Sequence, residues 1–244
     1  MYINLIKKKK MKTVILAGGK GTRISEKTKK IPKPMIKVGG IPLLLHIINI
    51  YKSYGHNEFI ICAGYKSNII KNYFNKKKFK SKITVVNTGL NTGTAGRILK
   101  IQKYLYKEKN FFLTYGDGLS NININNLYKF HLLKKKIITT TAVQYPSRFG
   151  ILKFDGKKNF LVERFNEKSK NQFINGGFLV VSNKIFNFIN NYQSSLEIDC
   201  IPKIVEKKQL VAYKHFGFWQ CLDDINDKKK LDNFFKKNKY PWKK

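Results

Sequence analysis

The sequence predicts an α/β fold in which a mostly parallel sheet lies between two layers of helices. Short apolar runs that end in Gly or Asp alternate four times with segments of helical periodicity over residues 13–135. The runs are apolar on both faces, which is typical of parallel strands covered on both sides. After residue 136 the strands are separated by short turns, so we expect a smaller antiparallel part in the second half. The expected architecture is three-layered and Rossmann-like, with a mixed central sheet.

The individual elements follow from the same pattern. In the first half we expect strands at residues 13–19, 58–64, 82–89 and 110–118. The helices expected there are 42–55, 67–74, 94–106 and 123–135. The first of these has Pro42 in its first turn and Gly55 at its end, as helix boundaries prefer. In the second half we expect strands at 137–144, 149–155, 159–167 and 174–182, helices at 183–190 and 198–208, an extended segment at 210–224 and a last helix at 225–238.

The length of 244 residues suits one large α/β domain. The sequence has no Gly-, Ser- or Pro-rich linker and no internal repeat, so we expect a single domain over residues 11–244. We expect residues 1–10 to be an N-terminal extension, with Met11 a candidate start, because the first strand follows directly. In this extension the basic run follows a very short apolar one, which is the wrong order for a secretory signal. No run reaches the roughly 18 apolar residues of a membrane span, and we expect no membrane partner.

The net charge of +35 raises the question of a nucleic-acid partner. Only four of the 49 basic residues are Arg, and the Lys residues are spread along the whole chain. This distribution indicates compositional drift more than a shaped binding surface, so we expect no specific nucleic-acid partner and only a general attraction for anionic substrates. The three cysteines, Cys62, Cys200 and Cys221, are far apart and odd in number. They form no disulfide or zinc pattern, and a reducing cytoplasm is the expected location.

A glycine-rich loop follows the first predicted strand in "VILAGGKGTR". Gly18, Gly19 and Gly21 lie where the strand ends, which is where open α/β sheets bind their ligands. Backbone N–H groups in such a loop can converge on phosphate oxygens. The loop is neither a P-loop nor a dinucleotide fingerprint, since Ile24 stands at the third glycine position of the latter. An ordinary tight turn, with Arg23 as a surface residue, is the alternative.

A lysine between two prolines follows this loop. Pro32 and Pro34 restrict the backbone on both sides of Lys33, so we expect an extended, stiff segment at this position. Together with the glycine loop this pattern predicts a phosphate clamp. The alternative is a solvated lysine in a loop.

Two carboxylates end predicted strands further along the chain. Asp117 lies between two glycines in "LTYGDG", and Asp223 follows "WQCL". Mg²⁺ on a nucleotide typically takes one or two protein carboxylates, so these two are candidate metal ligands. The alternative for Asp117 is a helix cap, and Asp224 is a good N-cap for the last helix.

Two weaker patterns complete the candidate site. "RFNEKS" contains Glu167 and Lys168, and "INGGF" contains Asn175 and Gly176. Each pattern alone is typical of a surface ion pair or a glycine-rich turn. Together they can supply a phosphate contact and hydrogen-bonding partners for a sugar.

These patterns, in this order, resemble the sugar-1-phosphate nucleotidyltransferase family. The G-G-x-G-T-R…P-K-P signature of that family reads "GGKGTRISEKTKKIPKP" here. "EFIICAGYK", "TGLNTGTAGR", "FFLTYGDGLSNINI" and the tail from "GFWQ" to "PWKK" resemble its glucose-1-phosphate cytidylyltransferase branch. The resemblance covers nearly the whole chain after Met11. The chain departs from that branch in three places. After Phe74 it has only a short "NKKKFKS", where the branch has a longer segment that helps build the nucleotide site and subunit contacts. It also has "TAGR" where the branch has "TGGR", and "NEKS" where the branch has "REKP".

The resemblance implies a nucleotidyltransferase fold, a reaction and a set of site residues. The implied reaction is Mg²⁺-dependent attack of a sugar 1-phosphate on the α-phosphorus of a nucleoside triphosphate (NTP), with release of pyrophosphate. CTP and α-D-glucose 1-phosphate are the implied substrates, and a homo-oligomer that serves deoxysugar or surface-polysaccharide synthesis is the implied context. The implied catalytic residues are Arg23, Lys33 and Asp117, and the implied metal ligands are Asp117 and Asp223. The implied nucleotide-binding residues are Leu16, Ala17, Gly18, Gly19, Gly21, Thr22, Arg23, Thr92, Gly93, Thr94, Ala95, Gly96 and Gly116. The implied sugar-phosphate residues are Gly150, Glu167, Lys168, Asn175 and Gly176.

Two alternatives remain open. The same chemistry can use UTP, dTTP or GTP, or another sugar phosphate, because composition does not reveal which base a loop accepts. A non-catalytic sugar-nucleotide-binding regulatory protein would keep the fold without the reaction. The presence of both candidate metal carboxylates, Asp117 and Asp223, argues against it.

Overall fold

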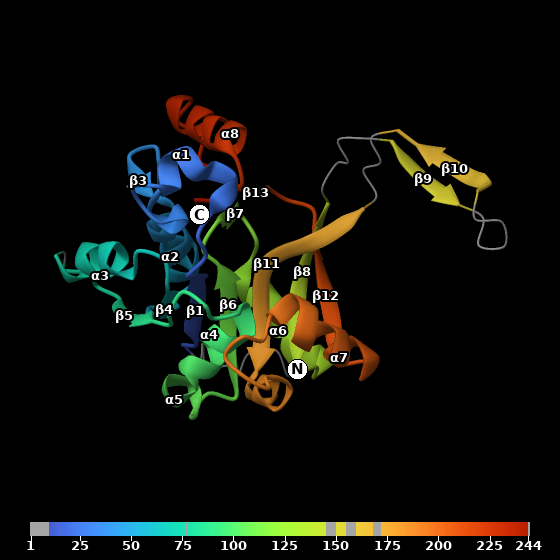
Figure 1. Ribbon diagram of the computed structural model, residues 1–244, viewed down its shortest axis with the longest axis horizontal. Coiled ribbons are helices and arrows are strands. Elements are labelled where there is room, and N and C mark those ends of the chain that lie inside the picture. Colours follow the sequence, from blue (N-terminus) through green and yellow to red (C-terminus); the bar gives the residue numbers. More distant parts are fainter. Residues whose placement is uncertain (1–9, 77, 145–149, 155–159, 168–171, 244) are drawn as a thin grey trace, which may run out of the picture.

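The computed structural model describes residues 10–76, 78–144, 150–154, 160–167 and 172–243 (Figure 1). Its main feature is a seven-stranded sheet in the order β12-β8-β11-β6-β1-β4-β5. The strands of this sheet are β1 (Lys12–Ala17), β4 (Glu58–Ala63), β5 (Lys82–Asn87), β6 (Asn110–Tyr115), β8 (Ile138–Gln144), β11 (Phe173–Ser182) and β12 (Leu210–His215).

The first four of these strands are parallel to one another. On β1, Thr13 pairs with Phe59 of β4 on one side and with Phe112 of β6 on the other. β5 extends the parallel part beyond β4, whereas β11 runs antiparallel to β6 and β8, and β12 runs parallel to β8. The mixed, mostly parallel sheet expected from the sequence is therefore confirmed. The carboxyl ends of β1, β4 and β6 meet at one edge of this sheet.

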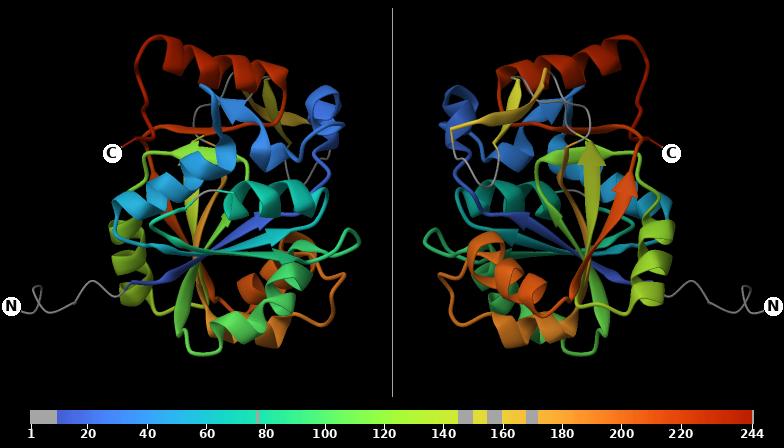
Figure 2. Two further views of the ribbon diagram at one scale, coloured as in Figure 1. Left: turned by 90° about the vertical axis from the view of Figure 1, so that its left-hand side faces the viewer. Right: turned by 90° about the vertical axis from the view of Figure 1, so that its right-hand side faces the viewer.

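Helices cover both faces of the sheet (Figure 2). Because successive side chains of a strand point to opposite faces, Val14 and Leu16 of β1 pack in one core and Ile15 packs in the other. The helices are α1 (Ser25–Thr28), α2 (Leu43–Ser53), α3 (Ser67–Asn75), α4 (Thr94–Lys100), α5 (Gln102–Leu105), α6 (Ile124–Lys134), α7 (Ile201–Glu206) and α8 (Ile225–Lys236). Residues of α2, α3, α6 and α8 belong to the core of Ile15, and residues of α4, α5 and α7 belong to the core of Val14. None of the helices within the described ranges is long and apolar enough to cross a membrane.

Three small antiparallel pairs complete the architecture. They are β2 (Lys37–Val38) with β3 (Ile41–Pro42), β7 (Gly118–Ser120) with β13 (Trp219–Cys221), and β9 (Ile151–Phe154) with β10 (Val162–Asn166). The pairing of β7 with β13 places Cys221 opposite Gly118, and the N–H of Leu222 donates to the carbonyl of Asp117. This pair therefore brings two segments that are about a hundred residues apart in sequence to the same edge of the sheet.

The structure differs from the expected elements in several places. The helix expected at 183–190 is a 3-10 helix over Asn183–Phe188. The helix expected at 94–106 is divided into α4 and α5 at Ile101, whose side chain is fully buried and whose N–H makes a tighter turn to Ile98. The segment expected at 210–224 is divided into β12 and β13, which belong to different sheets, with Gly217 between them. The helix expected at 198–208 begins earlier, as a π-helical turn over Leu196–Cys200, before it continues as α7. The division of 210–224 follows from long-range pairing, since β12 pairs with β8 and β13 pairs with β7.

Candidate active site

Two adjoining cavities lie at the carboxyl ends of the parallel strands. The Gly-loop cavity has a volume of about 410 Å³ and is lined by residues of 16–21, 33–34, 92–97, 115–117 and 195–197. The β11 cavity, of about 240 Å³, is lined by residues of β11 and β13 together with Arg23 and Asp223. Tyr115 and Asp117 line both cavities, so the boundary between the two runs along the end of β6.

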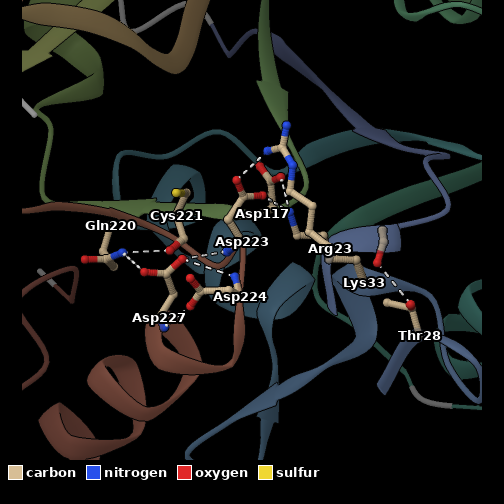
Figure 3. Close-up of polar contacts among 10 residues, drawn as sticks. Arg23, Thr28, Lys33, Asp117, Gln220, Cys221, Asp223, Asp224 and Asp227 are labelled. Atoms are coloured by element: carbon tan, nitrogen blue, oxygen red, sulfur yellow. Dashed lines mark hydrogen bonds and ion pairs between the residues drawn. The ribbon is translucent and has the colours of Figure 1, made fainter. Parts of the chain in front are cut away.

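A cluster of charged side chains lies at this boundary (Figure 3). The Lys33 ammonium donates to Asp117 Oδ2 at 2.9 Å and to Asp223 Oδ1 at 2.8 Å. Arg23 Nη1 donates to the other oxygen of Asp223, Oδ2, at 2.6 Å. The Lys33 side chain is 13% exposed, whereas that of Arg23 is 78% exposed. Lys33 therefore bridges the two carboxylates, and Arg23 contacts that of Asp223 from the solvent side.

The backbone around Lys33 corrects one expectation. Pro32 is extended, but Lys33–Met35 forms a 3-10 turn instead of the extended segment expected from the two prolines. The turn closes through hydrogen bonds from the N–H of Met35 to Pro32 and from that of Ile36 to Lys33. Pro34 sits within the first two positions of this turn, where its missing N–H costs nothing. The prolines thus fix Lys33 through a turn whose following residues, Met35 and Ile36, are buried in the core.

The pKa values of this cluster reflect its ion pairs. Burial opposes the charge of Lys33, but Asp117 and Asp223 outweigh this effect and raise the pKa of the ammonium above its usual value. Partial burial likewise opposes ionisation of Asp223, but Lys33 and Arg23 outweigh it and lower the pKa of the Asp223 carboxyl. Both groups are therefore charged over a wider pH range than isolated side chains.

The start of α8 fixes the position of Asp223. Asp224 caps this helix and accepts from the N–H groups of Asn226 and Asp227, as the sequence predicted for Asp224. Asp227 is buried, and its Oδ2 accepts from the N–H groups of Asp223 and Asp224. This capping box holds the backbone of Asp223 while its side chain turns toward Lys33. The expected helix-cap alternative for Asp117 is wrong, because Asn123 caps the next helix, α6.

A buried arginine that the sequence analysis missed supports the glycine loop. Arg97 of α4 is 5% exposed and donates to the carbonyl of Gly18 at 3.2 Å, to that of Gly89 at 2.9 Å and to Thr88 Oγ1 at 2.5 Å. Within the described residues no carboxylate lies within ion-pair distance of Arg97. A Cβ atom on Gly18 would lie 2.1 Å from Arg97 Nη1, so the close approach of this guanidinium requires glycine. Arg97 lines the Gly-loop cavity and adds an uncompensated positive charge below the loop.

Comparison with known proteins agrees with this geometry. Residues 12–232 match the family described as nucleotidyl transferase. The chain belongs to this family. It is 37% identical over 257 residues to a glucose-1-phosphate cytidylyltransferase of Salmonella typhi, with 96% of this chain and 99% of the relative covered. It is 38% identical over 256 residues to a probable glucose-1-phosphate cytidylyltransferase of Bacillus subtilis (strain 168), with the same coverage. The crystal structure of HddC from Yersinia pseudotuberculosis complexed with GMP-PN superposes with a TM-score of 0.73 at 26% identity, over 92% of this chain and 99% of that one.

The protein is therefore a nucleotidyltransferase, and its predicted nucleotide-binding residues fall into two groups. The structure brings most of them to the lining of the Gly-loop cavity: Leu16, Ala17, Gly18, Gly19, Gly21, Thr92, Gly93, Thr94 and Gly116. Thr22 and Arg23 lie outside this lining, Thr22 being exposed and Arg23 facing the β11 cavity. Ala95 and Gly96 lie below the cavity wall, where their N–H groups donate to the carbonyl of Ser194.

The predicted sugar-phosphate residues are also divided by the structure. Asn175 and Gly176 line the β11 cavity, and the carbonyl of Gly176 accepts from Trp219 Nε1 at 2.7 Å. Gly150 and Glu167 lie close to each other at the base of the β9–β10 hairpin, outside both cavities. Lys168 is outside the described residues.

Several residues of the two cavities were missed by the sequence analysis. Besides Arg97 they include Tyr115, Ser195, Glu197 and Trp219. The sequence could have indicated Tyr115, because it precedes Gly116 and Asp117 in the "LTYGDG" motif. Glu197 was not, since it lies in a short helical turn without any local pattern.

The donor set at the boundary fits a magnesium ion. One oxygen each of Asp117 and Asp223 lies within 2.9 Å of a single ammonium nitrogen, so the two carboxylates are close enough to share one cation. Carboxylate oxygens suit Mg²⁺, which typically keeps waters and substrate phosphates as its other ligands. The described residues contain no group of three or more His, Cys, Asp or Glu that could hold a metal ion.

A larger cavity of about 590 Å³ lies elsewhere, between α2 and the C-terminal residues. Its lining is mostly apolar and aromatic, with Lys52 and Lys243 and without any acidic side chain. It lacks the carboxylates that a metal-dependent phosphate chemistry needs, so the two cavities at the sheet edge are the candidate active site.

Proposed function

We propose that the protein transfers a cytidylyl group from CTP to α-D-glucose 1-phosphate in the presence of Mg²⁺, forming CDP-glucose and pyrophosphate. The observation that carries this proposal is the Lys33 ammonium held between Asp117 and Asp223 beside a glycine loop. The choice of CTP and glucose 1-phosphate is supported by the relatives that carry this activity in their names and align over nearly the full chain.

The proposed chemistry needs no general base. A phosphate oxygen of the sugar 1-phosphate is already an anion, and it attacks the α-phosphorus of the NTP. A new P–O bond forms, the bond from the α-phosphorus to the bridging oxygen breaks, and pyrophosphate leaves with that oxygen. Catalysis then consists of alignment and of neutralising charge on the reacting phosphates.

The residues of this chain have distinct parts in that scheme. The glycine loop offers backbone N–H groups to the triphosphate, and the buried charge of Arg97 lies directly below it. Asp117 and Asp223 would hold Mg²⁺, which would supply positive charge to neutralise the reacting phosphates. Lys33 supplies a positive charge beside the glycine loop, where the α-phosphate would lie, and the exposed Arg23 supplies one on the solvent side.

The test is pyrophosphate release with glucose 1-phosphate, Mg²⁺ and each NTP in turn. We expect release with CTP and none in excess EDTA. Asp117→Asn should abolish release, whereas a non-catalytic binding protein would show none before the substitution either. Silence with every NTP and a panel of sugar phosphates would contradict the proposed function.

A second candidate keeps the chemistry and changes the base. The structure of HddC carries GMP-PN in its title, so a guanine nucleotide occurs within this fold. Release with GTP, UTP or dTTP in place of CTP would favour this candidate and leave the mechanism unchanged.

We also propose that the protein is a homo-oligomer, with support from the β9–β10 hairpin. This hairpin stands apart from the sheet in Figure 1, and a two-stranded hairpin alone is marginally stable in water. Its apolar side chains are exposed, among them Phe154 at 48% and Phe165 at 60%. A second copy of the chain would cover them. Light scattering should show a mass above that of one chain, and Phe154→Ser with Phe165→Ser should lower it; a wild-type mass of one chain at all concentrations would contradict this part.

A cytoplasmic location is part of the same proposal. All three cysteines are free, and Cys62 and Cys200 are buried. This state suits a reducing compartment.

A further inference from the structure

Tyr115 lies between the two cavities and lines both of them. Its phenol O–H donates to Glu197 Oε1 on the side of the Gly-loop cavity. Its ring lies against Gly177, where a Cβ atom would be 2.8 Å from Tyr115 Cδ2. The N–H of Gly177 in turn donates to Asn175 Oδ1 in the β11 cavity at 3.0 Å. The ring is therefore a shared wall that contacts Glu197 through its phenol and Asn175 through Gly177.

Glu197 is the acceptor at the end of this chain of hydrogen bonds. It lies on the π-helical turn that precedes α7 and accepts from Thr94 Oγ1 at 2.6 Å and from Ser195 Oγ at 2.9 Å, besides Tyr115. The Thr94 hydroxyl in turn accepts from the N–H of Leu196 at 2.7 Å. Within the described residues, Glu197 has only hydroxyl donors around its carboxylate and no ammonium or guanidinium in ion-pair distance. Hydrogen bonds to a charged acceptor are stronger than neutral ones, so this carboxylate holds three segments in place.

Hydrogen bonds fix the groups on both sides of the Tyr115 ring. On the side of the β11 cavity, Asn175 Oδ1 accepts from Thr140 Oγ1 at 2.8 Å and from the N–H of Gly177 at 3.0 Å. On the side of the Gly-loop cavity, the phenol donates its hydrogen bond to Glu197, because a carboxylate only accepts. Asn175, Gly177, Tyr115 and Glu197 therefore form one continuous path of contacts between the cavities.

We propose that Glu197 is a positioning residue that couples the two substrate cavities through Tyr115. This inference rests on the proposed function, which places the NTP in the Gly-loop cavity and the sugar phosphate in the β11 cavity. A ligand that contacts Asn175 orders Gly177 and the ring of Tyr115 packed on it, and through Glu197 it orders Thr94 at the start of α4. When the second ligand binds, this wall is already ordered, and the protein loses less conformational freedom. Each substrate therefore increases the affinity of the protein for the other.

The test measures this coupling directly. The probe is the non-reactive analogue α,β-methylene-CTP, whose Kd is determined by calorimetry with Mg²⁺, in the absence and presence of saturating glucose 1-phosphate. For the wild type we expect the sugar phosphate to lower this Kd at least about fivefold, the lower end of typical coupling between sites. In Glu197→Gln and in Tyr115→Phe we expect the ratio of the two Kd values to fall close to one. The double variant should be no worse than the more affected single variant, because both remove the same link.

Steady-state kinetics and a control variant separate positioning from general damage. In Tyr115→Phe the ring remains as a wall, so we expect the KM for glucose 1-phosphate to rise about tenfold while the melting temperature stays near that of the wild type. Tyr106→Phe, at a tyrosine that is 69% exposed and outside both cavities, is the matched control and should change neither value. If Glu197→Gln does not fold, Tyr115→Phe carries the test alone.

The possible outcomes are distinguishable. A coupling ratio that is the same in the wild type and in the variants would overturn the inference, and so would a wild-type ratio of one in an enzyme that turns over. A wild type that releases no pyrophosphate with any NTP and sugar phosphate would overturn the proposed function and the inference with it.

Discussion

The proposed function makes Lys33 and a magnesium ion alternative counter-ions for the same two carboxylates, and Lys33→Met would separate their effects. Methionine keeps the length and the apolar character of the lysine stem but removes the charge. In EDTA this leaves Asp117 and Asp223 close together without the ammonium that now lies 2.9 and 2.8 Å from them. The variant should therefore be less stable than the wild type when no metal is present.

The size of this loss follows from the two charge-assisted hydrogen bonds of Lys33. Each such bond contributes roughly 1.5–3 kcal/mol when both partners are buried. The carboxylates here are 35% and 37% exposed, so solvent screening reduces this value, and we expect a total of about 2 kcal/mol. For a chain of this length that corresponds to a drop of about 4–8 °C in melting temperature.

The assay is thermal unfolding in EDTA and in excess Mg²⁺. In Lys33→Met the metal no longer competes with the lysine, so Mg²⁺ should stabilise this variant more than the wild type. By calorimetry, the Kd of the variant for Mg²⁺ should be lower than that of the wild type. Turnover should stay about 10²–10³-fold below the wild type even with bound metal, since the donor to the α-phosphate is gone. The matched control is Lys82→Met, which removes an exposed ion pair with Glu58 at 3.0 Å and should change stability by less than about 0.5 kcal/mol. Equal Mg²⁺ stabilisation of Lys33→Met and wild type, or unchanged melting in EDTA, would refute the assignment of a shared counter-ion role.

Three further predictions concern the same site. Gly18→Ala forces Arg97 from its place, because the new Cβ would lie 2.1 Å from Nη1; we expect a loss of roughly 1–3 kcal/mol in urea unfolding and weaker CTP binding. Gly19→Ala has no atom within 4 Å of its Cβ and should leave the unfolding midpoint unchanged, and equal midpoints for both variants would contradict the packing argument. Asp117→Asn should lower the affinity for Mg²⁺ in calorimetry and abolish pyrophosphate release, so normal metal binding would exclude Asp117 as a ligand. In EDTA, the stability difference between wild type and Lys33→Met should depend on pH. The difference is present above the usual carboxyl pKa and is lost as the pH falls through the lowered pKa of Asp223. At the alkaline end it is lost as the pH rises through the raised pKa of Lys33. A difference that stays constant from about pH 3 to pH 11 would contradict this linkage.

The parts of the fold that could be predicted are those whose signals are local. The first half of the sheet follows from apolar runs that end in Gly or Asp, because parallel strands buried on both faces need such runs. The candidate site followed from strand ends: Gly18 directly follows β1, and Asp117 and Asp223 lie two residues after the ends of β6 and β13. The division of 210–224 into β12 and β13 could not be predicted, since it depends on which distant strand each half pairs with.

Arg97 and Glu197 show why the rest of the site is invisible in the sequence. Arg97 lies in a helix, where an arginine is ordinarily solvated, and it is buried only because three loops that end β1, β4 and β5 meet around it. Glu197 contacts Tyr115 across 82 positions of the chain. No local periodicity or spacing in the sequence predicts either contact, because both form only when the sheet is assembled.

The arrangement of charges explains why carboxylates matter so much in a chain of net charge +35. Attraction of a triphosphate needs no special site here, because lysines surround the whole molecule and act over about 10 Å at moderate salt. What the lysine-rich chain cannot supply is a single position for a divalent cation or a fixed acceptor for hydroxyl groups. In the proposed mechanism Asp117 and Asp223 would supply the first, and they accept hydrogen bonds from Lys33 in the structure. Glu197, in the Gly-loop cavity, is a fixed acceptor for the hydroxyl of Thr94. The proposal therefore gives the positive charges the task of attracting the substrates and these three carboxylates the task of orienting them.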